Sequence, residues 1–170
     1  MDFLALAKDR YSVRKLDSRE VEKEKLDSIL QAARLAPTAC NNQPVHLFVV
    51  QTPEAMAKLG TCTPYLFDAP VAIIVCANAE EEWVRPFDQD RSGVVDAAIV
   101  GTHIHLQVAC CGLGTTWVGY FDPAKLVAEF QIPQNLTPIA IFPIGYPAAE
   151  AQPSPMHTQR KTLEEMITYL

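Results

Sequence analysis

The 170-residue sequence lacks an excess of positive charge and lacks long uninterrupted apolar runs. Its 14 Lys and Arg against 20 Asp and Glu give a formal net charge of -6. Nucleic-acid binding is therefore not expected, because neutralising phosphates requires a basic surface. No apolar run approaches the roughly 18 residues of a membrane span, so no membrane association is expected. The beginning of the chain lacks the basic and apolar segments of a signal peptide, which favours a cytoplasmic location.

Glycine is also sparse, and neither glycine nor cysteine shows a recognisable site pattern. The five cysteines form no CxxC pair and are odd in number, as is typical of free thiols in a reducing compartment. No metal site is expected, because His103 and His105 are two residues apart and do not share a helix face. Gly112 and Gly114 form a G-x-G string without the third glycine of a dinucleotide-binding fold.

The pattern of apolar and turn-forming residues predicts a mixed fold in one domain, residues 1–170. Because helices and strands do not alternate regularly, we expect an α+β protein with a central, mainly antiparallel sheet flanked by helices. The expected helices are 2–9, 22–35, one from Pro53, 90–111, 123–130 and one from Thr162, and the expected strands are 46–51, 71–77, 115–121 and 138–146.

Two segments point to a second subunit. Residues 90–111 are apolar nearly all round, and such a helix must be covered on every side. A chain of this size is too small to cover it alone, so we expect part of the helix to lie at a dimer interface. Residues 147–158 are rich in Pro, Ala and Ser and predict an arm that leaves the main body.

Paired positive charges occur near both ends of the chain. In an extended segment Arg10, Ser12 and Arg14 would point the same way, and guanidinium groups suit phosphate. Arg160 and Lys161 precede a helix start, where backbone N–H groups also favour anions. Taken singly, an ordinary solvated surface explains the first stretch at least as well and the second stretch better.

Two further stretches have the composition of a binding loop and a binding strand. The loop 36–44 (APTACNNQP) offers amides and a hydroxyl to the polar edge of a heterocycle, although such loops are usually only turns. In 112–121 (GLGTTWVGYF), Gly119 weakens the expected strand, and such a glycine often marks the close approach of another group. A helix stop followed by a core strand is the alternative.

Together the four stretches, RYSVRK, APTACNNQP, GLGTTWVGYFD and RKTLEE, resemble the nitroreductase family in their order and placement. The resemblance implies a homodimer with FMN at the subunit interface. It implies that Arg10, Ser12 and Arg14 hold the phosphate, the ribityl chain and the N1/O2 side of the flavin, with Arg160 and the adjacent Lys161 at the phosphate.

The other two stretches would then surround the ring. The resemblance implies that the loop 37–43 comes from the partner subunit and covers the isoalloxazine, and that the backbone of Gly119 and Tyr120 lies near N5 and O4. The implied cofactor-binding residues are Arg10, Tyr11, Ser12, Arg14, Pro37, Thr38, Ala39, Asn41, Gln43, Trp117, Val118, Gly119, Arg160 and Lys161. The segment 147–170 would be an arm that packs on the partner.

The implied activity passes hydride from NAD(P)H through flavin N5 to a small acceptor, such as a nitroaromatic or quinone, by a ping-pong mechanism. The flavin carries this chemistry, so no catalytic side chain is expected. Thr38 and Val45 stand where the family often has Ser and Trp, which concerns the choice of substrate. Trp83 and Phe87 either line the substrate opening or anchor a surface loop. The alternatives are reductive dehalogenation or other flavin chemistry on the same fold, and a non-catalytic homodimer that binds another phosphate ligand.

Overall fold

A computed structural model describes residues 2–170. Its centre is a five-stranded sheet in the order β1-β5-β3-β2, with β4 also paired to β5, and all four ladders are antiparallel. This confirms the predicted α+β class with an antiparallel sheet. The strands are β1 Leu16–Asp17, β2 Val45–Val50, β3 Val71–Asn78, β4 Gly114–Thr115 and β5 Leu136–Pro147.

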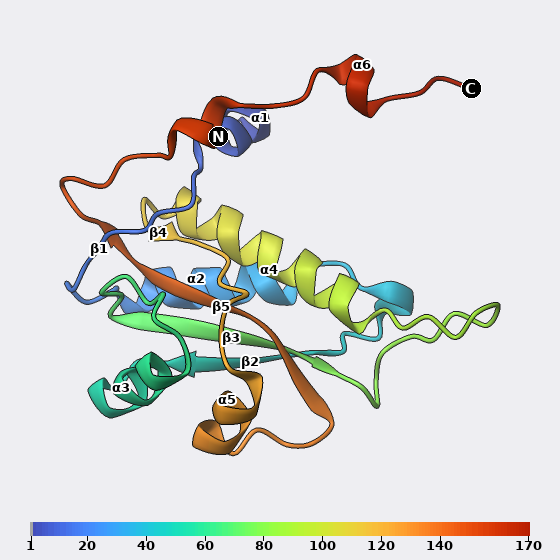
Figure 1. The fold of residues 1–170 in the computed structure, drawn as a ribbon, viewed down its shortest axis with the longest axis horizontal. Coiled ribbons are helices and arrows are strands. Elements are labelled where there is room, and N and C mark those ends of the chain that lie inside the picture. The colour runs from blue at the N-terminus through green and yellow to red at the C-terminus, as the bar shows by residue number, and fades with distance from the viewer. Residues whose placement is uncertain (1) are drawn as a thin grey trace.

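Helices cover both faces of the sheet (Figure 1). Helices α2 (Lys23–Arg34) and α4 (Gly93–Cys110) lie on one face, and α3 (Pro53–Cys62) and α5 (Pro123–Phe130) lie on the other. Alternate residues of β3 point into two separate cores: Ile73 contacts the α2–α4 side and Ile74 the α3–α5 side. A strand buried on both faces must be apolar throughout, which explains the continuous run that begins at Val71.

Short polar side chains begin several helices. The side chains of Asp2, Thr52 and Asp122 accept backbone N–H groups in the first turns of α1 (Phe3–Asp9), α3 and α5. Thr162 and Glu165 form a reciprocal capping box at α6 (Leu163–Met166). Two 3-10 turns, η1 (Ala39–Asn41) and η2 (Pro155–Thr158), complete the described elements.

The predicted strand 115–121 is wrong in extent, because only Gly114 and Thr115 form β4. Beyond Thr115, which pairs with Ile144, the chain regains the sheet only at a single bridge between Val118 and Ile141. In that register Pro143 would face residue 116, and proline has no N–H to donate to a ladder. Residues 116 and 117 therefore leave the sheet.

The long helix α4 begins at Gly93 instead of residue 90, because the residues before it form a hairpin. Val84 bridges Arg91, and the Arg85 N–H donates to the Asp90 carbonyl at 2.8 Å. By length and composition alone α4 is able to span a membrane, with a mean hydropathy of 1.3. However, one side of the helix, which includes Ile104, packs in the core between α2 and the sheet, as a core helix does.

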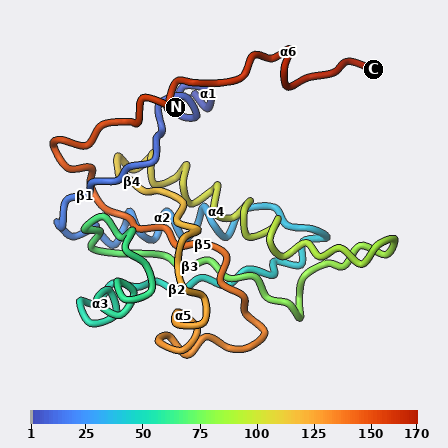
Figure 2. The backbone as a smooth tube through the Cα atoms, viewed as in Figure 1, coloured from blue at the N-terminus to red at the C-terminus, as the bar shows by residue number. Residues whose placement is uncertain are grey.

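The N-terminal segment around α1 and the stretch around η2 lie beside each other, as the blue and red segments of Figure 2 show. The ring of Tyr11, just after α1, meets the ring of His157 in η2 edge to face, with centroids 6.1 Å apart. After η2 the chain runs out from the body through α6, and Leu163, Met166 and Tyr169 are exposed along it.

Candidate functional site

Residues 10–14 form an extended segment beside β4. Ser12 bridges Thr115 in parallel, and the Val13 N–H donates to the Thr115 carbonyl at 3.0 Å. Val13 is buried against Gly114, where an added Cβ would lie 2.8 Å from the valine side chain. Because Val13 points inward, Ser12 and Arg14 on either side of it are left for a neighbouring cavity.

Three arginines from opposite ends of the chain line a cavity of about 240 Å³. Arg10 and Arg14 come from the extended segment, and Arg160 comes from the arm after η2. Within residues 2–170 the guanidinium groups of Arg10 and Arg14 form no hydrogen bond or ion pair. Uncompensated guanidinium groups around one space are a donor set that suits an anion. The other lining residues are Tyr11, Ser12, Ser154, Met156 and His157.

A second cavity, of about 210 Å³, shares Arg14 with the first. Its walls are largely aromatic: the Tyr65 and Phe67 rings stack at 5.8 Å, and Tyr120 meets Tyr65 edge to face at 5.5 Å. The remaining wall is the irregular segment 116–119. Arg14 therefore stands between a cationic space and an aromatic one.

The backbone of this segment offers donors at two positions. The N–H groups of Gly119 and Tyr120 make no hydrogen bond within the described residues. The Val118 N–H donates to the Ile141 carbonyl at 2.9 Å, so Val118 lines the cavity but has no free N–H group for a ligand. An added Cβ at Gly119 would meet only the Trp117 ring, at 3.6 Å, so the protein itself does not crowd the glycine. This is the open backbone surface that a flat ring needs.

The loop 37–43 lies elsewhere. It sits at the N-terminal end of α4, where the Ala39 N–H donates to the Asp96 carboxylate at 2.8 Å. Thr38 and Gln43 line a different cavity, of about 250 Å³, and the Thr38 hydroxyl accepts the Gln43 N–H at 2.9 Å. Pro37 and Asn41 are exposed. Within one protomer the loop therefore does not join the two cavities that share Arg14.

Three residues of this loop have left-handed backbone conformations that non-glycine residues rarely adopt. The φ angles of Cys40, Asn41 and Gln43 are 52°, 55° and 54°. Such conformations persist where the surroundings hold them, and they cluster at functional sites. The surroundings of the loop thus hold it in one specific shape.

The structure adds residues that sequence reasoning missed, and besides the loop 37–43 it leaves Lys161 out. Tyr65 and Phe67 line the aromatic cavity from an irregular segment, and His157 reaches the cationic cavity from the arm. None of these has a sequence signal beyond its residue type. Lys161 is exposed and lines neither cavity.

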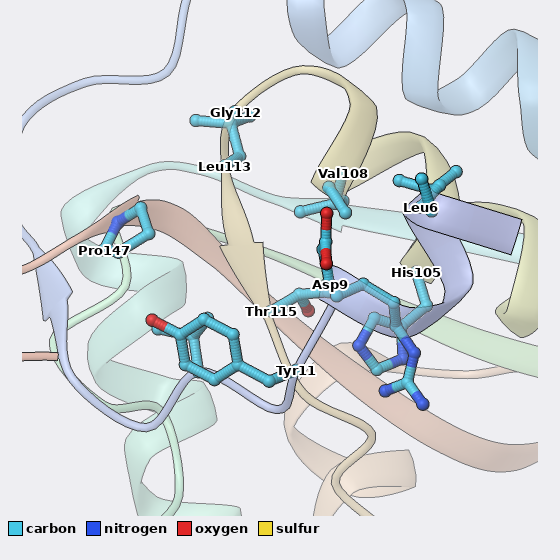
Figure 3. Close-up of a pocket in the computed structure, with 13 residues that line it drawn as sticks. Leu6, Asp9, Tyr11, His105, Val108, Gly112, Leu113, Thr115 and Pro147 are labelled. Atoms are coloured by element: carbon cyan, nitrogen blue, oxygen red, sulfur yellow. The ribbon is translucent and has the colours of Figure 1, made fainter. Parts of the chain in front are cut away.

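A fourth cavity, of about 340 Å³, lies between α1, α4 and β4 (Figure 3). It is mainly apolar, but two buried polar atoms on its wall, His105 Nε2 and Thr115 Oγ1, have no hydrogen-bond partner among residues 2–170. Burial, followed by the nearby positive charge of Arg10, lowers the pKa of His105 to about 4, against a smaller opposite effect of the Tyr11 backbone. His105 is therefore neutral at physiological pH.

The sheet, the helices on both of its faces and the two cavities that share Arg14 describe an α+β protein with a cationic space beside an aromatic one. The nitroreductase family model matches residues 7–63 and 61–146. A protein of Methanothermobacter thermautotrophicus, named provisionally as an NADH dehydrogenase/NAD(P)H nitroreductase, is 37% identical over 155 residues, which are 87% of this chain and 78% of that protein.

Solved structures of nitroreductases are also similar to this chain. A nitroreductase family protein of Clostridium difficile 630 is 42% identical, with a TM-score of 0.93 over 99% of this chain and 98% of its own. An FMN-dependent nitroreductase of Clostridium difficile R20291 is 30% identical, with a TM-score of 0.77 over 89% of this chain and 91% of its own. The chain belongs to the nitroreductase family.

Proposed function

We propose that this protein is an NAD(P)H-dependent flavin oxidoreductase that uses FMN to reduce nitroaromatics, quinones or similar small acceptors. The family and the activities named for its relatives support this assignment. The observation that carries it is the position of Arg14, which lines both the cationic and the aromatic cavity. A phosphate-bearing flat cofactor needs these two environments side by side.

The residues of the two cavities would bind different parts of the cofactor. Arg10, Ser12 and Arg160 hold the phosphate, and Arg14 lies where the tail meets the ring system. The free N–H groups of Gly119 and Tyr120 orient the polar edge of the ring. When bound, FMN would supply the hydride chemistry between NAD(P)H and the acceptor, in separate, ping-pong half-reactions. No side chain of the protein has to act as a nucleophile.

We also propose a cytoplasmic homodimer of single-domain chains, residues 1–170, with the 147–170 arm packed on the partner. Two observations support the dimer. Apolar side chains are exposed on α4, at Val94 and Val95, and along the arm, as at Leu163. In addition, the loop 37–43 lines neither of the two cavities that share Arg14, which supports a place for it over the ring of a second subunit.

Purified protein tests the proposal directly. After reconstitution with FMN we expect a yellow dimer whose flavin is bleached anaerobically by NADH or NADPH and is reoxidised by a nitroaromatic or a quinone. Initial rates at several acceptor concentrations should give parallel double-reciprocal lines. Bound FMN that neither nicotinamide reduces would show a different flavin reaction. Protein that never binds FMN would refute the proposal.

A further inference from the structure

We propose that Asp96 is a positioning residue that joins the loop 37–43 and the hairpin 79–92 into one rigid unit at the active site. The inference rests on the proposed function, in which the loop covers the flavin of the partner subunit. It concerns residues outside the cofactor cavities. The hairpin is the yellow-green projection beside the N-terminal end of α4 in Figure 1.

Asp96 lies in the first turn of α4 and is almost completely buried, with 1% of its surface exposed. Its Oδ1 accepts the Ala39 N–H at 2.8 Å, which ties it to the loop. Its Oδ2 accepts the Ser92 hydroxyl at 2.7 Å, and the Ser92 Oγ accepts the Trp83 N–H at 3.1 Å. A continuous chain of hydrogen bonds therefore runs from the loop through one carboxylate to the hairpin.

This carboxylate is placed to be a strong link. Hydrogen bonds to a charged acceptor are about twice as strong as neutral ones, and a helix N-terminus favours a negative charge. Asp96 forms no ion pair with the described residues, so the two hydrogen-bond donors and the helix N-terminus compensate its burial. Loss of the carboxylate would leave the Ala39 N–H and the Ser92 hydroxyl without their acceptor.

Both segments that Asp96 joins are ordered around it. The loop contains the three left-handed residues described above, which require external support. The hairpin is braced by its own contacts: the Ser92 N–H donates to the Trp83 carbonyl at 2.9 Å, and Glu82 pairs with Arg91. A second link joins the two segments, from the Asn42 amide to the Glu81 carbonyl at 3.0 Å.

The side chains on the loop and on the hairpin suggest what the unit does. The loop offers Asn41 and Gln43, and the hairpin carries Phe87 at its turn with 96% of its surface exposed. If the loop covers a flavin ring in the partner subunit, the hairpin attached to it moves with that cover. Asp96 therefore acts on cofactor retention and on acceptor binding together, without touching either molecule.

Amide hydrogen exchange on the dimeric protein without added FMN tests the coupling. In Asp96→Ala we expect the Ala39 and Trp83 amides to exchange faster by a common factor of about ten or more, with β3 amides unchanged. Thr52→Ala is the matched control, because it removes a helix cap remote from the loop. It should accelerate neither amide. Faster exchange at Ala39 alone, or at neither position, would overturn the inference.

A second variant and a second readout keep the test decisive. Asp96→Asn preserves shape and still offers an oxygen to Ala39, so it should fold and show a smaller acceleration that is equal at both amides. With FMN and NAD(P)H, Asp96→Ala should raise the dissociation constant of FMN and the KM for acceptor, and Asp96→Asn should recover most of both. Wild-type protein that binds no FMN would refute the proposed function while leaving the exchange result to decide the coupling.

Discussion

Replacing Arg14 with alanine should weaken FMN binding while leaving the fold intact. The Arg14 side chain is exposed and has no hydrogen-bond or ion-pair partner in the described chain, so its removal leaves no buried charge behind. The free energy of unfolding should therefore change by less than about 0.5 kcal/mol. A charge-assisted hydrogen bond contributes about 1.5–3 kcal/mol, which corresponds to roughly a 10- to 150-fold rise in the dissociation constant. Because Arg14 is solvated, we expect the lower end of that range.

The assay is titration of the protein with FMN, followed by quenching of flavin fluorescence, with urea unfolding of each variant in parallel. Lys15→Ala is the matched control, since it removes the same charge from the adjacent exposed residue, which lines neither cavity. It should change the dissociation constant less than about twofold, through general electrostatics alone. Equal effects of the two substitutions, or no effect of Arg14→Ala, would refute the assignment of Arg14 to the cofactor.

Three further outcomes follow from burial and packing. The folded-state pKa of His105, about 4, lies below its unfolded value of 6.5, so the unfolded chain takes up the proton first as the pH falls. Stability should drop between pH 6.5 and 4 by at most about 3 kcal/mol, and His105→Asn should lessen that slope in urea unfolding at pH 7 and 5. Gly101→Ala places a Cβ 2.7 Å from the Trp117 ring, so thermal unfolding should show a loss of about 1–3 kcal/mol in the free energy of unfolding. Gly119→Ala meets no such clash, so it should leave stability unchanged and weaken FMN binding. Burial raises the pKa of the Cys76 thiol to about 12, so mass spectrometry after alkylation of native protein should find exposed thiols modified and Cys76 intact; equal modification would contradict its burial.

The fold was predictable where local sequence and tertiary structure agree. The apolar run from Val71 forms the central strand, and Thr52 and Asp122 begin helices as their residue types indicate. The strand expected after Thr115 is interrupted because Pro143 lies opposite residue 116 in the sheet. This pairing is a tertiary contact, so the local sequence does not predict it. The start of α4 was missed for a similar reason, since the hairpin before it depends on contacts across the turn.

The candidate site was predictable only in part. The arginines at positions 10, 14 and 160 were identifiable because guanidinium groups suit phosphate, and the fold does gather them. Tyr65 and Phe67 come from an irregular segment, where residue type alone says nothing about position. Asp96 is a single acid in an apolar helix, and its role depends on the loop 37–43, which is distant from it in sequence, and on how the hairpin just before α4 folds back onto it.

The contribution of residues 154–160 to the cationic cavity has a consequence for biosynthesis. Ribosomes make the Arg10 end of that cavity among the first residues and the Arg160 end more than a hundred residues later. A nascent chain or a prematurely terminated product that stops before this stretch lacks the C-terminal wall of the cationic cavity, even when its sheet has formed. Under the proposed role of Arg160, we expect cofactor uptake only after translation has passed the arm, which would separate shortened products from functional ones.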